Sequence, residues 1–277
     1  MSELFPAARP LRTLTLFLAG LGLALAASAA ATVRISGTGS GTGGMQLMAD
    51  AFMRAHPDVK VEVVRAVGSS GGISALVAGK LELAVSNRPP NAKESAQAAL
   101  TAVEYARTPF VVAVHRNLGL SSLSEAEFSA LFAPGAATFP SGARVRPVFR
   151  LADATDTLLL KSIVPAAARA IDEASTRRGM LSADTDSDAV ELIETVPGAI
   201  GTTTLAQITS ERRTLVALAI GNKVPSLANL AAGHYPHFKS LYLVTTATAA
   251  PAIQRFVAFV STPAAQALLR AHGHLPR

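Results

Sequence analysis

The segment Val67-Gly68-Ser69-Ser70-Gly71-Gly72-Ile73 decides how this chain is expected to fold. It joins Val59 to Val67, whose alternating pattern predicts a β-strand, to a helix that is predicted to begin at Ile73. A third predicted strand, Leu81 to Ser86, follows that helix. A polar glycine-rich loop between a strand and a helix is typical of α/β proteins, in which the strands lie parallel in one sheet.

The same order of elements occurs immediately upstream. The β-branched run Thr32 to Ile35 predicts a strand, the stretch Gly37 to Gly44 predicts a glycine-rich loop, and Met45 to Ala55 predicts a helix. Strand, loop and helix therefore occur twice in succession, which predicts a parallel sheet with helices on its faces.

A second α/β region is predicted from the apolar run Pro109 to Val114 onward. Its predicted elements are a helix with the capping box Ser124/Glu127, a strand Val145–Phe149, a turn Leu151–Thr157, a helix Ser187–Glu194, strands Ala199–Thr203 and Lys239–Thr245, and a last helix opened by Thr262-Pro263. No repeat or low-complexity linker separates the two regions, so we expect two α/β lobes without a flexible tether.

Three polar loops each follow a predicted strand and open a predicted helix. They are residues 38–44, residues 68–72, and the segment Asp153-Ala154-Thr155-Asp156-Thr157 with Arg150 before it. A helix N-terminus offers unpaired N–H groups and a partial positive charge, and glycine and hydroxyl residues improve access and add donors. Each loop alone is compatible with an ordinary cap or turn, but three at corresponding strand ends predict an oxyanion site.

The N-terminus has the pattern of a cleaved signal peptide over residues 1–29. Arg9 and Arg12 precede the apolar run Leu14 to Ala27, and Ala27-Ser28-Ala29 supplies a cleavage motif. The chain has no cysteine, so we expect neither a lipid anchor nor a disulfide, and the mature protein is predicted to be periplasmic. The formal net charge of +6 is scattered and aromatic residues make up 5%, which argues against nucleic-acid binding.

Several segments together resemble the phosphate-binding proteins of bacterial ABC importers, a branch of the two-lobed periplasmic binding proteins. The resemblance is carried by Gly37–Phe52, Val67–Ile73, Leu83–Asn87, Gly233–Pro236 before the strand Leu241–Val244, and Phe256–Gly273. It implies two lobes joined by hinge strands, with lobe I over residues 30–114 and 236–277 and lobe II over residues 115–235. It also implies a monomer that delivers its ligand to an inner-membrane permease driven by an ATPase subunit.

The resemblance implies a ligand set drawn from both lobes. The implied ligand-binding residues are Ser40, Gly41, Thr42, Ser69, Ser70, Gly71, Asn87, Arg150, Thr155 and Thr157. Phosphate is the first expected ligand, and no cofactor, metal or catalytic residue is expected.

Two positions depart from the family pattern. Asn87 stands where the family has the carboxylate that accepts the proton of monohydrogen phosphate, so sulfate, molybdate and tungstate also become candidate ligands. Asp156 would place a carboxylate beside the anion and oppose binding unless it points away, and capping its helix is the alternative role. Asp153 is placed in sequence to pair with Arg150.

Other classes of function remain open at this stage. Gly39-x-Gly41-x-x-Gly44, with Glu62 downstream, matches a dinucleotide-binding fingerprint and makes a nicotinamide-dependent enzyme the formal alternative. The departures at Asn87 and Asp156 support a second alternative. In it, the binding-protein fold is repurposed as a sensor, a secretion accessory or an interaction protein, with weak or no oxyanion binding. The six histidines lack the companions that a zinc site needs.

Overall fold

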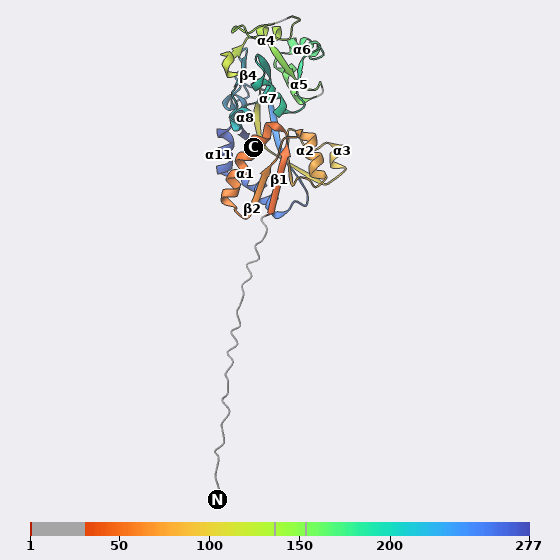
Figure 1. Cartoon of the computed structure of the whole chain (residues 1–277), viewed down its shortest axis with the longest axis vertical. Helices are drawn as coiled ribbons and strands as arrows, with labels where there is room; N and C mark the ends of the chain where they lie inside the picture. The colour runs from red at the N-terminus through yellow and green to blue at the C-terminus, as the bar shows by residue number, and fades with distance from the viewer. Residues whose placement is uncertain (2–30, 136, 153) are drawn as a thin grey trace.

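The structure is a computed structural model that describes residue 1 and residues 31–277, except residues 136 and 153. Apart from Met1, the predicted signal peptide lies outside the described residues. Within the described part of the chain, none of the helices is both long and apolar enough to cross a membrane. The described residues form an α/β molecule with two lobes (Figure 1).

A mixed β-sheet passes through both lobes in the order β2-β1-β3-β11-β4-β8-β6-β7. The bounds are β1 (Ala31–Gly37), β2 (Val59–Val63), β3 (Leu83–Ser86), β4 (Leu100–His115), β6 (Arg146–Phe149), β7 (Leu181–Ser182), β8 (Ala199–Thr204) and β11 (Phe238–Thr246). β9 (Leu215–Ala217) and β12 (Leu275–Pro276) also pair with β4, and β5 (Ser122–Leu123) pairs with β10 (Ala219–Ile220). β1 is parallel to β2 and β3, and β6 is parallel to β7 and β8, whereas β4 and β11 run antiparallel to their neighbours.

Helices cover both faces of the sheet in the first lobe. Successive side chains of β3 point to opposite faces of the sheet, so each face contributes to a different core. Leu83 and Val85 pack with α1 (Gly39–Ala55), α10 (Pro251–Val260) and α11 (Pro263–Ala271), in a core that also holds Phe52 and Phe256. Ala84 lies on the opposite face and packs with α2 (Gly68–Val77). The short helix α3 (Ala92–Ser95) follows β3.

One long strand, β4, belongs to both lobes. Its residues Leu100–Pro109 pair with β11 of the first lobe, and Phe110–Val114 pair with β8 of the second. The second lobe carries α4 (Glu125–Ala130), α5 (Thr155–Ile163), α6 (Ala168–Ser175), α7 (Asp186–Thr195), α8 (Leu205–Ser210) and α9 (Leu227–Ala231), with 3₁₀ turns at Arg116–Leu118 and Pro165–Ala167. Its aromatic core includes Phe110, Phe128 and Phe149.

The predicted α/β class with two lobes is confirmed, and so is the capping box of Ser124 and Glu127. Two predicted loops are helical instead. The glycine-rich stretch already belongs to α1 from Gly39, and α2 begins at Gly68 rather than at Ile73. The glycines there permit close packing: a Cβ at Gly72 would lie 2.7 Å from the Cα of Gly37. Glycine was therefore wrongly interpreted as a sign of an irregular loop at these positions.

A buried histidine, His274, packs against the first turns of α1. A Cβ at Gly44 would lie 2.6 Å from His274 Nε2, and this nitrogen has no hydrogen-bond partner among the described residues. Burial lowers the pKa of His274 to about 4, although hydrogen bonding to the backbone near His272 opposes the shift. We therefore treat His274 as a neutral side chain in the folded protein.

The stability of the fold should depend on pH through His274. An unfolded histidine takes up a proton below about pH 6.5, whereas folded His274 does so only near pH 4. Between these values the unfolded state binds more protons, so the free energy of unfolding should fall as the pH falls, by about 3 kcal/mol from this side chain. Urea titrations from pH 7 to pH 4 measure the effect.

The variant His274→Gln should lose most of that extra pH dependence. A His234→Gln variant is the matched control, because His234 is exposed at the surface. Identical pH profiles for His274→Gln and the parent would show that His274 does not stay neutral in the fold.

Candidate functional site

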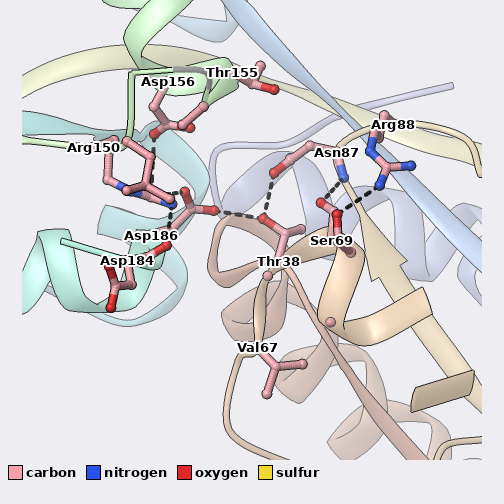
Figure 2. A pocket seen from close by; sticks show the side chains of 15 residues that line it. Thr38, Val67, Ser69, Asn87, Arg88, Arg150, Thr155, Asp156, Asp184 and Asp186 are labelled. Carbon is pink, nitrogen blue, oxygen red and sulfur yellow. Dashed lines mark hydrogen bonds and ion pairs between the residues drawn. The ribbon is translucent and has the colours of Figure 1, made fainter. Parts of the chain in front are cut away.

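A cleft of about 410 Å³ lies between the two lobes (Figure 2). The first lobe lines it with the first turn of α2 and with Asn87 and Arg88 after β3. The second lobe lines it with Arg150, Leu151 and residues 154–156, and with Asp184 and Asp186 at the start of α7. Residues 68–71 and 154–156 of the predicted polar loops therefore face each other across one cleft.

The strongest donors of this region converge on the carboxylate of Asp186, the first residue of α7 (Figure 2). Its Oδ2 atom accepts hydrogen bonds from Thr38 Oγ1 (2.7 Å), Ser40 Oγ (2.7 Å) and the Ser40 backbone N–H (3.1 Å). Its Oδ1 atom accepts from Arg150 Nη1 (2.8 Å) and Lys239 Nζ (3.0 Å). Five donors from both lobes thus bind one oxyanion, and that oxyanion belongs to the protein.

A second carboxylate completes a buried group of four charges. Asp156 Oδ1 lies 2.6 Å from Lys239 Nζ, and Asp156 Oδ2 lies 3.9 Å from Arg150 Nη1. The side chains of Lys239, Asp156 and Asp186 are 1%, 6% and 7% exposed, and that of Arg150 is 12% exposed. The two cations and two carboxylates are therefore largely shielded from solvent. Such a set is stable only while each charge keeps its partners.

The pKa values within this group follow from burial and from the neighbouring charges. Burial alone would raise the pKa of Asp186, but Lys239, Arg150 and the hydroxyls of Thr38 and Ser40 hold it well below its usual range. Burial raises the pKa of Asp156, and Lys239 only partly opposes it. Burial would lower the pKa of Lys239, but the two carboxylates raise it above its usual value. Asp186 is therefore the permanently charged carboxylate of the pair.

The first-lobe wall of the cleft offers further donors. Ser69 Oγ accepts the backbone N–H of Asn87 (3.0 Å), and Ser70 Oγ accepts Arg88 Nη2 (2.9 Å). Each hydroxyl keeps its own hydrogen to donate, and both residues lie in the first turn of α2, where backbone N–H groups are also unpaired. Arg88 is held in place by Glu94 through contacts of 2.7 and 2.8 Å. This wall can bind an anion.

The comparisons with known proteins identify the family. A family model described as the PBP superfamily domain matches residues 24–263. The chain belongs to the PBP superfamily. The phosphate-binding protein PstS of Bacillus subtilis (strain 168) is 24% identical over 230 residues, which cover 82% of this chain and 75% of that protein. The periplasmic-binding-protein superfamily predicted from the sequence is thereby confirmed.

Solved structures of the superfamily show the same fold. A protein described as a phosphate ABC transporter substrate-binding protein from Clostridium perfringens, solved with bound phosphate, has a TM-score of 0.70 at 19% identity, covering 89% of this chain and 99% of that one. An ABC-type phosphate transport receptor from Vibrio cholerae has a TM-score of 0.55 at 18% identity, covering 88% and 99%. The comparisons favour a binding protein over the nicotinamide-dependent enzyme.

The structure places the ten predicted ligand residues of this PBP superfamily member in two groups. Those that line the cleft are Ser69, Ser70, Gly71, Asn87, Arg150 and Thr155; those outside its lining are Ser40, Gly41, Thr42 and Thr157. Ser40 is buried against Asp186, and Thr42 Oγ1 donates to Gly39 O. Thr157 Oγ1 donates to Leu151 O. Both threonine hydroxyls therefore bind their own segments of backbone.

The structure shows what the side chains do at both positions that depart from the family pattern, Asp156 and Asn87. Asp156 is not the cap of α5, because its N-cap is Ala154, and it instead faces Lys239 and Arg150. Asn87 Oδ1 lies 2.5 Å from Thr38 Oγ1, so the amide supports the loop that carries Thr38. The predicted pairing of Asp153 with Arg150 lies outside the described residues.

Sequence reasoning missed Asp186 and Lys239 as members of the site. Asp186 lies immediately before the predicted helix Ser187–Glu194, in a polar run to which no role was assigned. Lys239 lies in a strand of otherwise apolar and hydroxyl side chains, and an isolated lysine there was the available signal. A lysine is almost never fully buried unless it is paired, so the strand alone pointed to carboxylate partners elsewhere in the chain.

Proposed function

We propose that the protein is an extracytoplasmic solute-binding protein that captures a small oxyanion between its lobes for an ABC importer. Phosphate is the leading candidate for this oxyanion. Membership of the PBP superfamily and the phosphate-binding relatives support this proposal. The observation that carries it is the convergence of Thr38, Ser40, Arg150 and Lys239 on one carboxylate. Donors arranged around a carboxylate also suit the oxygens of phosphate, since both are compact oxyanions.

The predicted lobe limits, residues 30–114 with 236–277 and residues 115–235, form part of this proposal. β4 and the segment before β11 would act as the hinge, because the pairing partner of β4 changes after Pro109. Closure of the lobes would bring the wall of α2 toward Arg150 and bury the solute between them. An inner-membrane permease would then receive the solute, and the N-terminal leader would direct export to the periplasm.

The proposal predicts selective stabilisation of the mature protein by one oxyanion. Extensively dialysed protein is heated with phosphate, sulfate, molybdate or tungstate, and the unfolding midpoint is compared with that of protein in chloride. At a ligand concentration of about one hundred times the dissociation constant, the bound anion adds roughly 2.7 kcal/mol to the free energy of unfolding. Phosphate is expected to give the largest shift.

Arg150→Ala should abolish the shift induced by phosphate, because Arg150 lines the cleft and its guanidinium is the bidentate donor expected for the anion. Arg146→Ala is the matched control, since Arg146 is an exposed arginine at the start of β6, the strand that Arg150 follows. The readout is the difference with and without anion for each variant, so a change in basal stability does not affect it. Absence of a shift with all four anions in the parent protein would contradict the proposal and favour the repurposed fold with weak oxyanion binding.

A further inference from the structure

The donors that suit an oxyanion already converge on Asp186. A carboxylate offers about four lone-pair positions, and Asp186 receives five contacts from four residues. Lys239 Nζ also lies 3.2 Å from Ser40 Oγ, so the donors contact one another around the carboxylate. A free anion must therefore compete with Asp186 for these donors.

The position of Asp186 is not explained by a role in its own helix. The N-cap of α7 is Thr185, whose hydroxyl accepts the backbone N–H of Asp188, while Asp188 Oδ2 accepts the backbone N–H of Thr185. This capping box leaves the side chain of Asp186 without a capping partner in α7. Its carboxylate instead crosses to Thr38 and Ser40, which belong to the first lobe.

We propose that Asp186 is an internal ligand that occupies the innermost oxyanion subsite and holds the lobes together when no solute is bound. A captured anion must displace this carboxylate before it can bind Thr38, Ser40 and Lys239. The statement about the solute rests on the proposed function, whereas the statement about the lobes does not. Asp186 thereby determines how tightly, and in which conformation, the protein takes up an anion.

The charges of the buried group require displacement rather than addition. Arg150 and Lys239 are already balanced by Asp156 and Asp186, so a dianion added to the closed site would face two carboxylates within a few ångströms. Removal of Asp186 from the donors restores the positive charge that a solute needs. The adjoining cleft, of about 410 Å³, has room for the displaced side chain.

The conformational part is tested on ligand-free protein by measuring the distance between the lobes. The chain has no cysteine, so Lys93→Cys and Leu158→Cys allow two spin labels to be placed without other substitutions. Both positions are exposed, one in α3 and one in α5. Double electron–electron resonance should give one short distance in the labelled parent and a longer, broader distribution after Asp186→Ala.

Glu191→Ala is the matched control, because it removes an exposed carboxylate from the same helix. It should keep the distance of the parent. Equal distances in the parent and in Asp186→Ala would overturn the proposal. If Asp186→Ala does not fold, Asp186→Asn removes the charge at nearly constant volume and is expected to shift the distribution in the same direction.

The binding part is tested by calorimetric titration with inorganic phosphate. If the internal carboxylate occupies the subsite in at least about nine molecules of ten, its removal should tighten phosphate binding about tenfold or more. An unchanged dissociation constant in Asp186→Ala would overturn the displacement step. A longer distance without any phosphate binding in either protein would support the internal ligand and contradict the proposed transport function, so the two failures can be told apart.

Discussion

Replacement of Lys239 by methionine is expected to lower the free energy of unfolding at pH 7 by about 3–5 kcal/mol, because it leaves two buried carboxylates with one cation. Methionine keeps the apolar part of the side chain and removes only the ammonium group, which lies 5.6 Å from the centre of the Phe110 ring. The loss is therefore electrostatic. Urea unfolding at constant pH measures it.

The loss in Lys239→Met should become smaller as the pH falls. The pKa of Asp156 is already raised by burial, and removal of the ammonium raises it further, so this carboxyl is neutralised more easily in the variant. A raised pKa adds stability at low pH, and that stability disappears as the pH rises through the folded value. The added substitution Asp156→Asn should restore part of the loss at pH 7.

Lys60→Met is the control for Lys239→Met. Lys60 forms an ion pair with Glu62, but its side chain is 60% exposed, so little stability should depend on it. A similar small loss in both variants would mean that the buried group does not hold its charges as described.

The second large effect is expected for Gly37→Ala, which should lower the free energy of unfolding by more than about 3 kcal/mol or prevent folding. Gly37 has a φ of +143°, and a Cβ there would lie 1.8 Å from Val85 O. The same carbonyl accepts the backbone N–H of Thr38 (2.9 Å), so it cannot move away without disturbing the start of α1. The variant should thus lose both stability and the alignment of Thr38 in the site.

Gly79→Ala isolates the steric part of that effect. Gly79 also has a positive φ, +67°, but a Cβ there would meet nothing within 4 Å. Its replacement should cost only the backbone strain, about 1–2 kcal/mol. Urea unfolding measures the loss of unfolding free energy in both variants. Equal losses in Gly37→Ala and Gly79→Ala would show that the contact with Val85 O is not what requires glycine at position 37.

The fold could be predicted from the sequence because its signals are local. The alternation at Val59 to Val67 and the capping box of Ser124 and Glu127 each depend on a few neighbouring residues. The capping box is as predicted, and the predicted strand forms over Val59–Val63, four residues shorter than expected. The starts of α1 and α2 were placed too late, since glycine has a low helix propensity and is favoured there by close packing, of Gly44 on His274 in α1 and of Gly72 on Gly37 in α2. Tertiary contact outweighed local preference at these positions.

The site could be predicted only in part, because it depends on residues far apart in the chain. The wall formed by Ser69 and Ser70 follows from a strand, a loop and a helix in sequence. The pairing of Asp186 with Ser40 and Lys239 joins residues separated by 146 and 53 positions. Nothing in the local pattern at position 186 distinguishes a carboxylate that starts a helix from one that occupies an anion site.

The strand β4 also determines whether the two lobes unfold together or separately. Its first ten residues complete the sheet of one lobe, and the following residues complete the sheet of the other. Loss of order in either lobe exposes the hydrogen-bonding edge of half of this strand and weakens the register of the remainder. The lobes should therefore melt in a single cooperative transition, even with the proposed hinge between them. Flexibility at a hinge and thermodynamic independence are distinct properties, and the first would not require the second in this topology.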